Sequence, residues 1–75
     1  MLTEQDIDDI FTYHGPFGDQ TQRYVALRND AKKLAYTIQA HCPESREKSL
    51  AITSLQQTIQ WANAAIAIHE KEAKT

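Results

Sequence analysis

Apolar residues recur every three or four positions along most of this 75-residue chain, which is the spacing that gathers side chains on one face of an α-helix. Three helices and no strands are predicted; they cover about residues 3–11, 20–41 and 45–73. Three of the chain's four glycines and prolines fall within residues 12–18, which predicts a loop there, and Pro43 ends the second helix. Because long helices joined by a tight turn pack antiparallel, residues 1–75 should form one all-α hairpin domain with a short N-terminal helix.

Capping residues mark the start of each predicted helix. Thr3 is followed three residues later by Asp6, and Asp19 is followed by Gln22 at the same spacing. Ser45 precedes the third helix. Thr3 and Asp19 are expected to accept a backbone N–H hydrogen bond in the first helical turn, and Ser45 can do the same.

The third helix carries two apolar lines, whereas the chain offers only one helix for it to pack against. The second helix presents one apolar face, made of Tyr24, Leu27, Ala31, Leu34, Ile38 and His41 or Cys42. The lines of the third helix are Ile52, Leu55, Ile59, Ala62 and Ile66, and Leu50, Ser54, Trp61, Ala65 and Ile68. The second line needs a further partner, most simply another copy, so we expect a homo-oligomer with Trp61, Ala65 and Ile68 at its interface. Asn63 can set the register of that contact.

Charge is distributed unevenly, although the net charge is only -2. Residues 1–19 hold five acidic residues and no Lys or Arg, whereas residues 20–48 hold six basic and three acidic residues. A chain without net positive charge is unsuited to DNA or RNA polymers. The basic segment fits a small anionic ligand or a complementary neighbouring subunit.

Two segments hold side chains suited to a nucleotide. Tyr13 and His14 lie in the glycine-containing loop, where Tyr13 can stack on a base and His14 can hydrogen-bond to it. Alternatively, Tyr13 and Phe17 pin the short helix to the hairpin. Arg28 and Lys32, one turn apart, can clamp phosphate, with Tyr36 one turn further on the same face. The alternative is that Asp30 and Glu44 neutralise these two cations.

Ser45 and Arg46 open the third helix and can hold an anion at its N-terminus, or Ser45 can be an ordinary cap. Catalysis and metal binding have little support. His14, His41 and His69 are scattered, and Cys42 is the single cysteine, so neither a metal motif nor an intramolecular disulfide is expected. We expect that the protein binds no cofactor and is not an enzyme. Neither a signal peptide nor a membrane-spanning run is found, which predicts a protein of a reducing cytoplasm.

Several motifs together resemble the phage anti-CBASS sponge proteins, over about residues 9–69. They are Phe11-Thr12-Tyr13-His14, Gly18-Asp19-Gln20, Arg23-Tyr24, Leu27-Arg28, Ala31-Lys32, Cys42-Pro43-Glu44-Ser45-Arg46-Glu47-Lys48-Ser49-Leu50-Ala51 and Trp61-Ala62-Asn63-Ala64-Ala65-Ile66-Ala67. The resemblance implies a phage protein acting in the cytoplasm of the infected bacterium. It also implies helical hairpins that assemble, typically as hexamers, and sequester cyclic di- and trinucleotides without cleaving them. Related sponges take cyclic ADP-ribose signals made by TIR proteins, and a helical adaptor for a host protein is the remaining alternative.

The same resemblance assigns roles to individual residues. It implies that Tyr13 stacks on the base of a cyclic dinucleotide such as cGAMP and that Arg28 meets the phosphates, with Lys32 as a second cation. Further candidates for ligand or interface contacts are His14, Phe11, Ser45, Arg46, Asn63 and His69. The family often has an arginine, linked with cyclic-trinucleotide binding, where this chain has Ile68. Trinucleotide binding is therefore expected to be weaker or absent.

Overall fold

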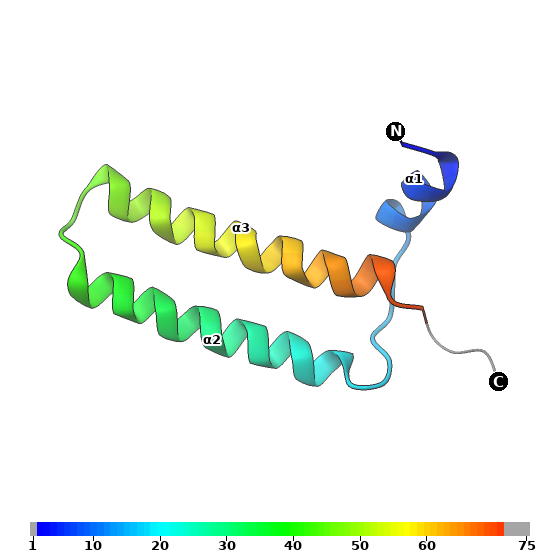
Figure 1. The fold of residues 1–75 in the computed structure, drawn as a ribbon, viewed down its shortest axis with the longest axis horizontal. Coiled ribbons are helices and arrows are strands. Elements are labelled where there is room, and N and C mark those ends of the chain that lie inside the picture. The colour runs from blue at the N-terminus through cyan, green and yellow to red at the C-terminus, as the bar shows by residue number, and fades with distance from the viewer. Residues whose placement is uncertain (1, 72–75) are drawn as a thin grey trace.

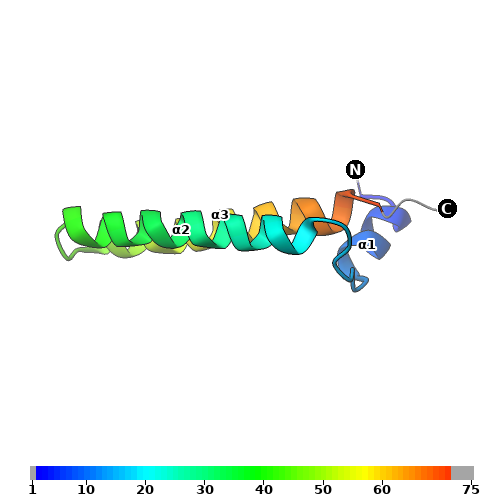
Figure 2. The same ribbon diagram turned by 90° about the horizontal axis from the view of Figure 1, so that it is seen from below.

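The hairpin is formed by two long helices that lie side by side and antiparallel. A computed structural model describes residues 2–71, with helices α1 (Glu4–Phe11), α2 (Gln20–His41) and α3 (Arg46–His69) and no strand in that part of the chain. α1 lies at the open end of the hairpin, beside the C-terminal end of α3 (Figure 1). Seen from below, the hairpin is a single layer, and the molecule measures 51 × 30 × 15 Å (Figure 2). The predicted all-helical hairpin with a short N-terminal helix is confirmed.

The caps of α1 and α3 were predicted correctly. The Thr3 hydroxyl accepts from the Asp6 N–H at 3.1 Å, and the Asp6 carboxylate accepts from the Thr3 N–H at 2.9 Å. The Ser45 hydroxyl accepts from the Lys48 N–H at 3.1 Å. Each bond satisfies a backbone donor that has no partner inside its own helix. These local bonds explain why α1 and α3 begin where the sequence indicates.

The expected cap of α2 is wrong. Asp19 occupies the N-cap position, but its side chain makes no capping hydrogen bond. Its carboxylate accepts instead from Nε of Arg23, at 3.1 Å, because a cation one turn along the helix is a stronger donor than a neutral backbone amide. Gln20 holds the chain at this point, since its Oε1 accepts from the Phe17 N–H at 3.2 Å.

Lys48 closes the turn between α2 and α3. The carbonyl of Gln39 would ordinarily accept from the N–H four residues ahead, but that residue is Pro43, which has none. The Lys48 ammonium donates to this carbonyl at 3.3 Å and to Oε1 of Glu44 at 2.6 Å. The Lys48 side chain is only 7% exposed, so this bond is made in a largely dehydrated position.

Packing between the two long helices follows one predicted line of α3 and corrects two positions of α2. Each member of the first α3 line is half-buried, as expected: Ile52, Leu55, Ile59, Ala62 and Ile66. Leu34 was assigned to the packing face, yet it is 49% exposed, whereas Ala35 is half-buried. His41 and Cys42, the alternative last members of the predicted α2 face, are both exposed. The face runs from Ala31 through Ala35 to Ile38. No apolar side chain among residues 2–71 is fully buried, so one copy of the hairpin lacks a closed core.

The third helix ends earlier than predicted. It stops at His69, and Glu70 has an extended backbone; the expected end at Ala73 lies outside the described residues. The Glu70 carboxylate is held by α2, because Arg23 Nη1 donates to its Oε2 at 2.6 Å and Gln20 Nε2 donates to its Oε1 at 3.0 Å. Arg23 binds both oxygens, which with Gln20 lowers the pKa of Glu70 to about 2 and raises the pKa of Arg23.

Polar contacts at Asp9 attach α1 to the hairpin. The Lys71 ammonium lies 3.4 Å from Oδ1 of Asp9, and Nε2 of His14 donates to the Asp9 carbonyl at 2.6 Å. A hydrogen bond from the Gln5 side chain is the main cause of the lowered pKa of Asp9, and Lys71 adds to it. Helix α1 therefore keeps its position through its charged and polar side rather than through a buried apolar contact.

Candidate ligand-binding surface

Arg28 borders a shallow hollow between α2 and α3. The hollow has a volume of about 370 Å³ and is lined by Tyr24 and Arg28 of α2 and by Asn63, Ala64 and Ala67 of α3. The two alanines leave space beside the aromatic ring and the guanidinium. An aromatic face next to a cation suits a ligand with flat rings and phosphate charge. Sequence reasoning missed Tyr24 as a lining residue, because its helical position assigned it to the packing face.

Lys32 and Tyr36 continue the same stripe toward the turn. They border a second hollow of about 420 Å³ together with Ala35, Gln39 and Ile52. The spacing of four residues places Arg28, Lys32 and Tyr36 along one side of α2. The stripe therefore offers two cations about 6 Å apart along the helix axis, at about 1.5 Å per residue.

The cations of this stripe are not neutralised within the described chain. Neither Arg28 nor Lys32 has a carboxylate of residues 2–71 within 4.0 Å, and Glu44 pairs with Lys48 instead. The alternative in which Asp30 and Glu44 neutralise the stripe is therefore wrong for this part of the chain. Both cations remain available to an anion.

Tyr13 lies outside the hollow that Arg28 borders. Its side chain is 86% exposed, in the loop between α1 and α2, with its ring beside Gly15. The alternative in which Tyr13 pins α1 to the hairpin is therefore wrong, and of the two aromatic residues only Phe17 is half-buried. His14 uses Nε2 to hold the loop against Asp9. One copy of the chain thus leaves the proposed stacking residue and the proposed phosphate-binding residue apart.

Asn63 presents an unused acceptor beside Arg28. Its Oδ1 is buried and has no hydrogen-bond donor within the described residues, and Asn63 lines the Arg28 hollow. Buried polar atoms in folded proteins nearly always have a partner, which can be a water, a ligand or a second chain. Asn63, already a candidate from the sequence, therefore has an acceptor that the described residues leave without a donor.

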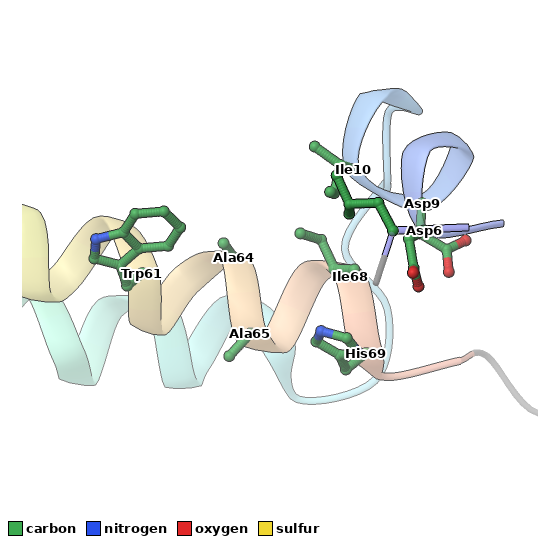
Figure 3. Close-up of a pocket in the computed structure, with 9 residues that line it drawn as sticks. Asp6, Asp9, Ile10, Trp61, Ala64, Ala65, Ile68 and His69 are labelled. Carbon is green, nitrogen blue, oxygen red and sulfur yellow. The ribbon is translucent and has the colours of Figure 1, made fainter. Parts of the chain in front are cut away.

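The predicted interface residues gather in a separate, mostly apolar hollow of about 410 Å³. Its lining residues are Leu2, Asp6, Asp9, Ile10, Trp61, Ala64, Ala65, Ile68 and His69. Figure 3 shows Ile10 of α1 near Ile68 of α3, with the Trp61 ring two turns back along α3. Trp61 is 76% exposed, and Phe11 is also exposed. A tryptophan left open beside other apolar groups is typical of a surface that a partner covers.

Ser45 and Arg46 begin α3, and this end of the hairpin lies opposite the loop that joins α1 to α2 (Figure 1). Ser45 is occupied by its cap to Lys48 and by its own donation to the Pro43 carbonyl at 3.1 Å, while Arg46 is exposed. The described residues contain no group of three His, Cys, Asp or Glu side chains placed to hold a metal ion. They also contain no helix long and apolar enough to cross a membrane.

The protein is a small helical hairpin whose surface combines aromatic and cationic side chains beside shallow hollows. The model of the Acb2/Tad1 hairpin domain matches residues 3–67, and the chain belongs to this family, the anti-CBASS sponges. Its members are known as sponges that bind signalling molecules, rather than as enzymes. Comparison with curated proteins and with solved structures gave no match.

Proposed function

We propose that this protein sequesters cyclic dinucleotides such as cGAMP without cleaving them. Membership of the sponge family carries the proposal, and the free cations of α2 support its ligand class. Tyr13 stacks on a base, Arg28 binds phosphate, and Lys32 adds a second positive charge. The stacking contact favours a ligand with a flat base. The two cations favour a ligand whose phosphates carry negative charge at its centre.

The binding pocket is shared between copies of the chain. Because Tyr13 is not part of the hollow around Arg28, we infer that the ligand contacts Tyr13 from one copy and Arg28 from another. A two-fold arrangement of this kind matches a ligand that is itself nearly two-fold symmetric. The open apolar surface at Trp61, Ala65 and Ile68 supplies contacts for assembly, and a hexamer is the expected form.

Sequestration has a simple biological consequence. The protein acts in the cytoplasm of a bacterium infected by the phage that encodes it, and it removes the cyclic nucleotide before the CBASS effector is activated. Ile68 is uncharged, so cyclic triadenylate binds more weakly than the cyclic dinucleotide.

Isothermal titration with 3′,3′-cGAMP tests the proposal. Tyr13→Ala should weaken binding by about 5- to 150-fold, the equivalent of one stacked base at about 1–3 kcal/mol. Arg28→Ala should weaken it by about 10- to 150-fold, the equivalent of a charged hydrogen bond at about 1.5–3 kcal/mol. Lys33→Ala is the matched control, because Lys33 is an exposed cation of the same helix outside both α2 hollows.

Three results would contradict the proposed function or its assigned residues. Unchanged affinity in both variants would remove the assigned site. The bound nucleotide should be recovered intact after the complex is denatured, and recovery of a linear product would contradict sequestration. Submicromolar affinity for cyclic triadenylate would contradict the role given to Ile68.

A further inference from the structure

The two residues that follow α3 contact both ends of the loop formed by residues 12–19. Lys71 reaches Asp9, near the start of the loop, at 3.4 Å. Glu70 reaches Gln20 at 3.0 Å and Arg23 at 2.6 Å, just after the end of the loop. Both residues lie beyond residues 3–67, the segment that the family model matches.

These contacts continue into the loop through backbone groups. At its start, the Asp9 carbonyl accepts from Nε2 of His14, the neighbour of Tyr13. At its end, the Gln20 side chain forms a bridge, because its Nε2 donates to Glu70 while its Oε1 accepts from the Phe17 N–H. Gln20 is 2% exposed, so water has little access to compete for this bridge.

Tyr13 is the loop residue whose orientation matters for the proposed stacking. Its side chain is almost fully exposed, so packing against the rest of the described chain does not hold it in place. A stacking residue on a loose loop binds weakly, since only the fraction of the population with the correct loop conformation is competent. Whatever fixes the two ends of the loop therefore raises the apparent affinity.

We propose that Glu70 and Lys71 form a clasp that positions loop 12–19, and with it Tyr13, for the cyclic dinucleotide. Glu70 and Lys71 are positioning residues that do not touch the ligand. The affinity effect rests on the proposed function, whereas the effect on the loop itself does not. The contacts with Arg23 and Gln20 lower the pKa of Glu70 to about 2, so its carboxylate stays ionised and bound to Arg23 down to acidic pH.

Two variants open the clasp from its two sides. Glu70→Gln removes the charge that Arg23 binds, and Lys71→Met removes the ammonium that meets Asp9. Lys71→Arg is the conservative rescue, because it keeps a cation of sufficient reach. Glu47→Gln is the matched control for Glu70→Gln, since Glu47 is exposed at the far end of α3 and makes no hydrogen bond within the described chain.

The first measurement needs no ligand. Amide hydrogen exchange of Phe17, followed by NMR at 10 °C on folded protein, should be faster in Glu70→Gln by on the order of tenfold. It should be unchanged in Glu47→Gln. Unchanged exchange in Glu70→Gln would overturn the clasp.

The second measurement is the affinity for 3′,3′-cGAMP at the same temperature, with helicity and assembly size checked for each variant. Glu70→Gln and Lys71→Met should each weaken binding by on the order of tenfold, and Lys71→Arg should restore it. A lower unfolding temperature with unchanged affinity would assign the contacts to stability alone and overturn the positioning role. If the wild-type chain binds no cyclic dinucleotide, the proposed function fails, and the exchange of Phe17 still decides whether the clasp exists.

Discussion

Replacing Lys48 by Met should lower the free energy of unfolding by about 1–2 kcal/mol. Lys48 supplies the donor that Pro43 cannot give to the Gln39 carbonyl at the end of α2. Methionine keeps an unbranched stem of similar length and a similar helix propensity, so the packing beside the turn and the helical backbone are preserved. The ammonium is the group that the substitution removes.

The size of this effect follows from the exposure of the two partners. The Glu44 side chain is 85% exposed, so its ion pair with Lys48 contributes at most about 1 kcal/mol. The bond to the Gln39 carbonyl is made by a lysine whose side chain is only 7% exposed, and leaving such an acceptor without a donor costs about 1–3 kcal/mol. Removing a dehydrated charge recovers part of this cost, which brings the net loss to about 1–2 kcal/mol.

Urea unfolding followed by circular dichroism measures the loss. The protomer concentration must be held fixed, because assembly contributes to apparent stability. A loss of 1–2 kcal/mol corresponds to a decrease of about 4–16 °C in Tm for a domain of this size. Lys33→Met is the control for the loss of an exposed lysine and should change stability by less than about 0.5 kcal/mol. Equal losses in the two variants, or in Lys48→Met and Glu44→Gln, would refute the role of the carbonyl contact.

Three further predictions concern the site, the assembly and the clasp. Tyr13→Ala and Arg28→Ala chains that are refolded together should bind the cyclic dinucleotide more tightly than either variant alone, because a mixed pair restores one half of the two-fold pocket, with Tyr13 from one copy and Arg28 from the other; titration measures this, and a mixture that binds as weakly as its components would exclude a shared pocket. Trp61→Ala should shift the mass measured by light scattering toward the monomer, since a buried aromatic anchor contributes about 2–4 kcal/mol to an interface; an unchanged mass would place the interface elsewhere. The pKa of Glu70 is about 2 in the folded chain against 4.5 ordinarily, so its stabilising contribution is present above about pH 4.5 and is lost as the pH falls toward 2. Urea unfolding at several pH values should therefore show a steeper decline over this range in the wild type than in Glu70→Gln, and parallel curves would contradict it.

Features set by nearest neighbours could be predicted from the sequence. Thr3 and Ser45 cap their helices because the partner N–H lies three residues ahead, which is a spacing visible in the chain. The apolar line from Ile52 to Ile66 was equally visible as a helical repeat. Arg28 and Lys32 were recognised as a cationic stripe for the same reason, although the sequence did not reveal that both lack a carboxylate partner in the described chain.

Features set by contacts between distant segments could not be predicted. Glu70 lies 47 and 50 residues from Arg23 and Gln20, and nothing in the local pattern indicates that its carboxylate binds these two side chains of α2. Ala35 rather than Leu34 faces α3 because of how the two helices are rotated about their axes. The spacing of apolar residues alone does not determine which of these two adjacent positions is buried. Asp19 had a correct capping position, but the competing Arg23 side chain decided its partner.

The lack of a closed core and the position of Tyr13 outside the Arg28 hollow have one physical explanation. A single hairpin buries no apolar side chain fully among residues 2–71, so it gains little hydrophobic stabilisation and leaves Trp61 open. The same single copy keeps Tyr13 outside the hollow of Arg28. In the assembly that we propose, covering the apolar surface would also bring a second Tyr13 loop within reach of the cationic stripe, so that assembly and ligand binding would stabilise each other. A ligand that bridges two copies then acts as part of their interface, and for a sponge this means that the captured messenger is released only when those contacts open.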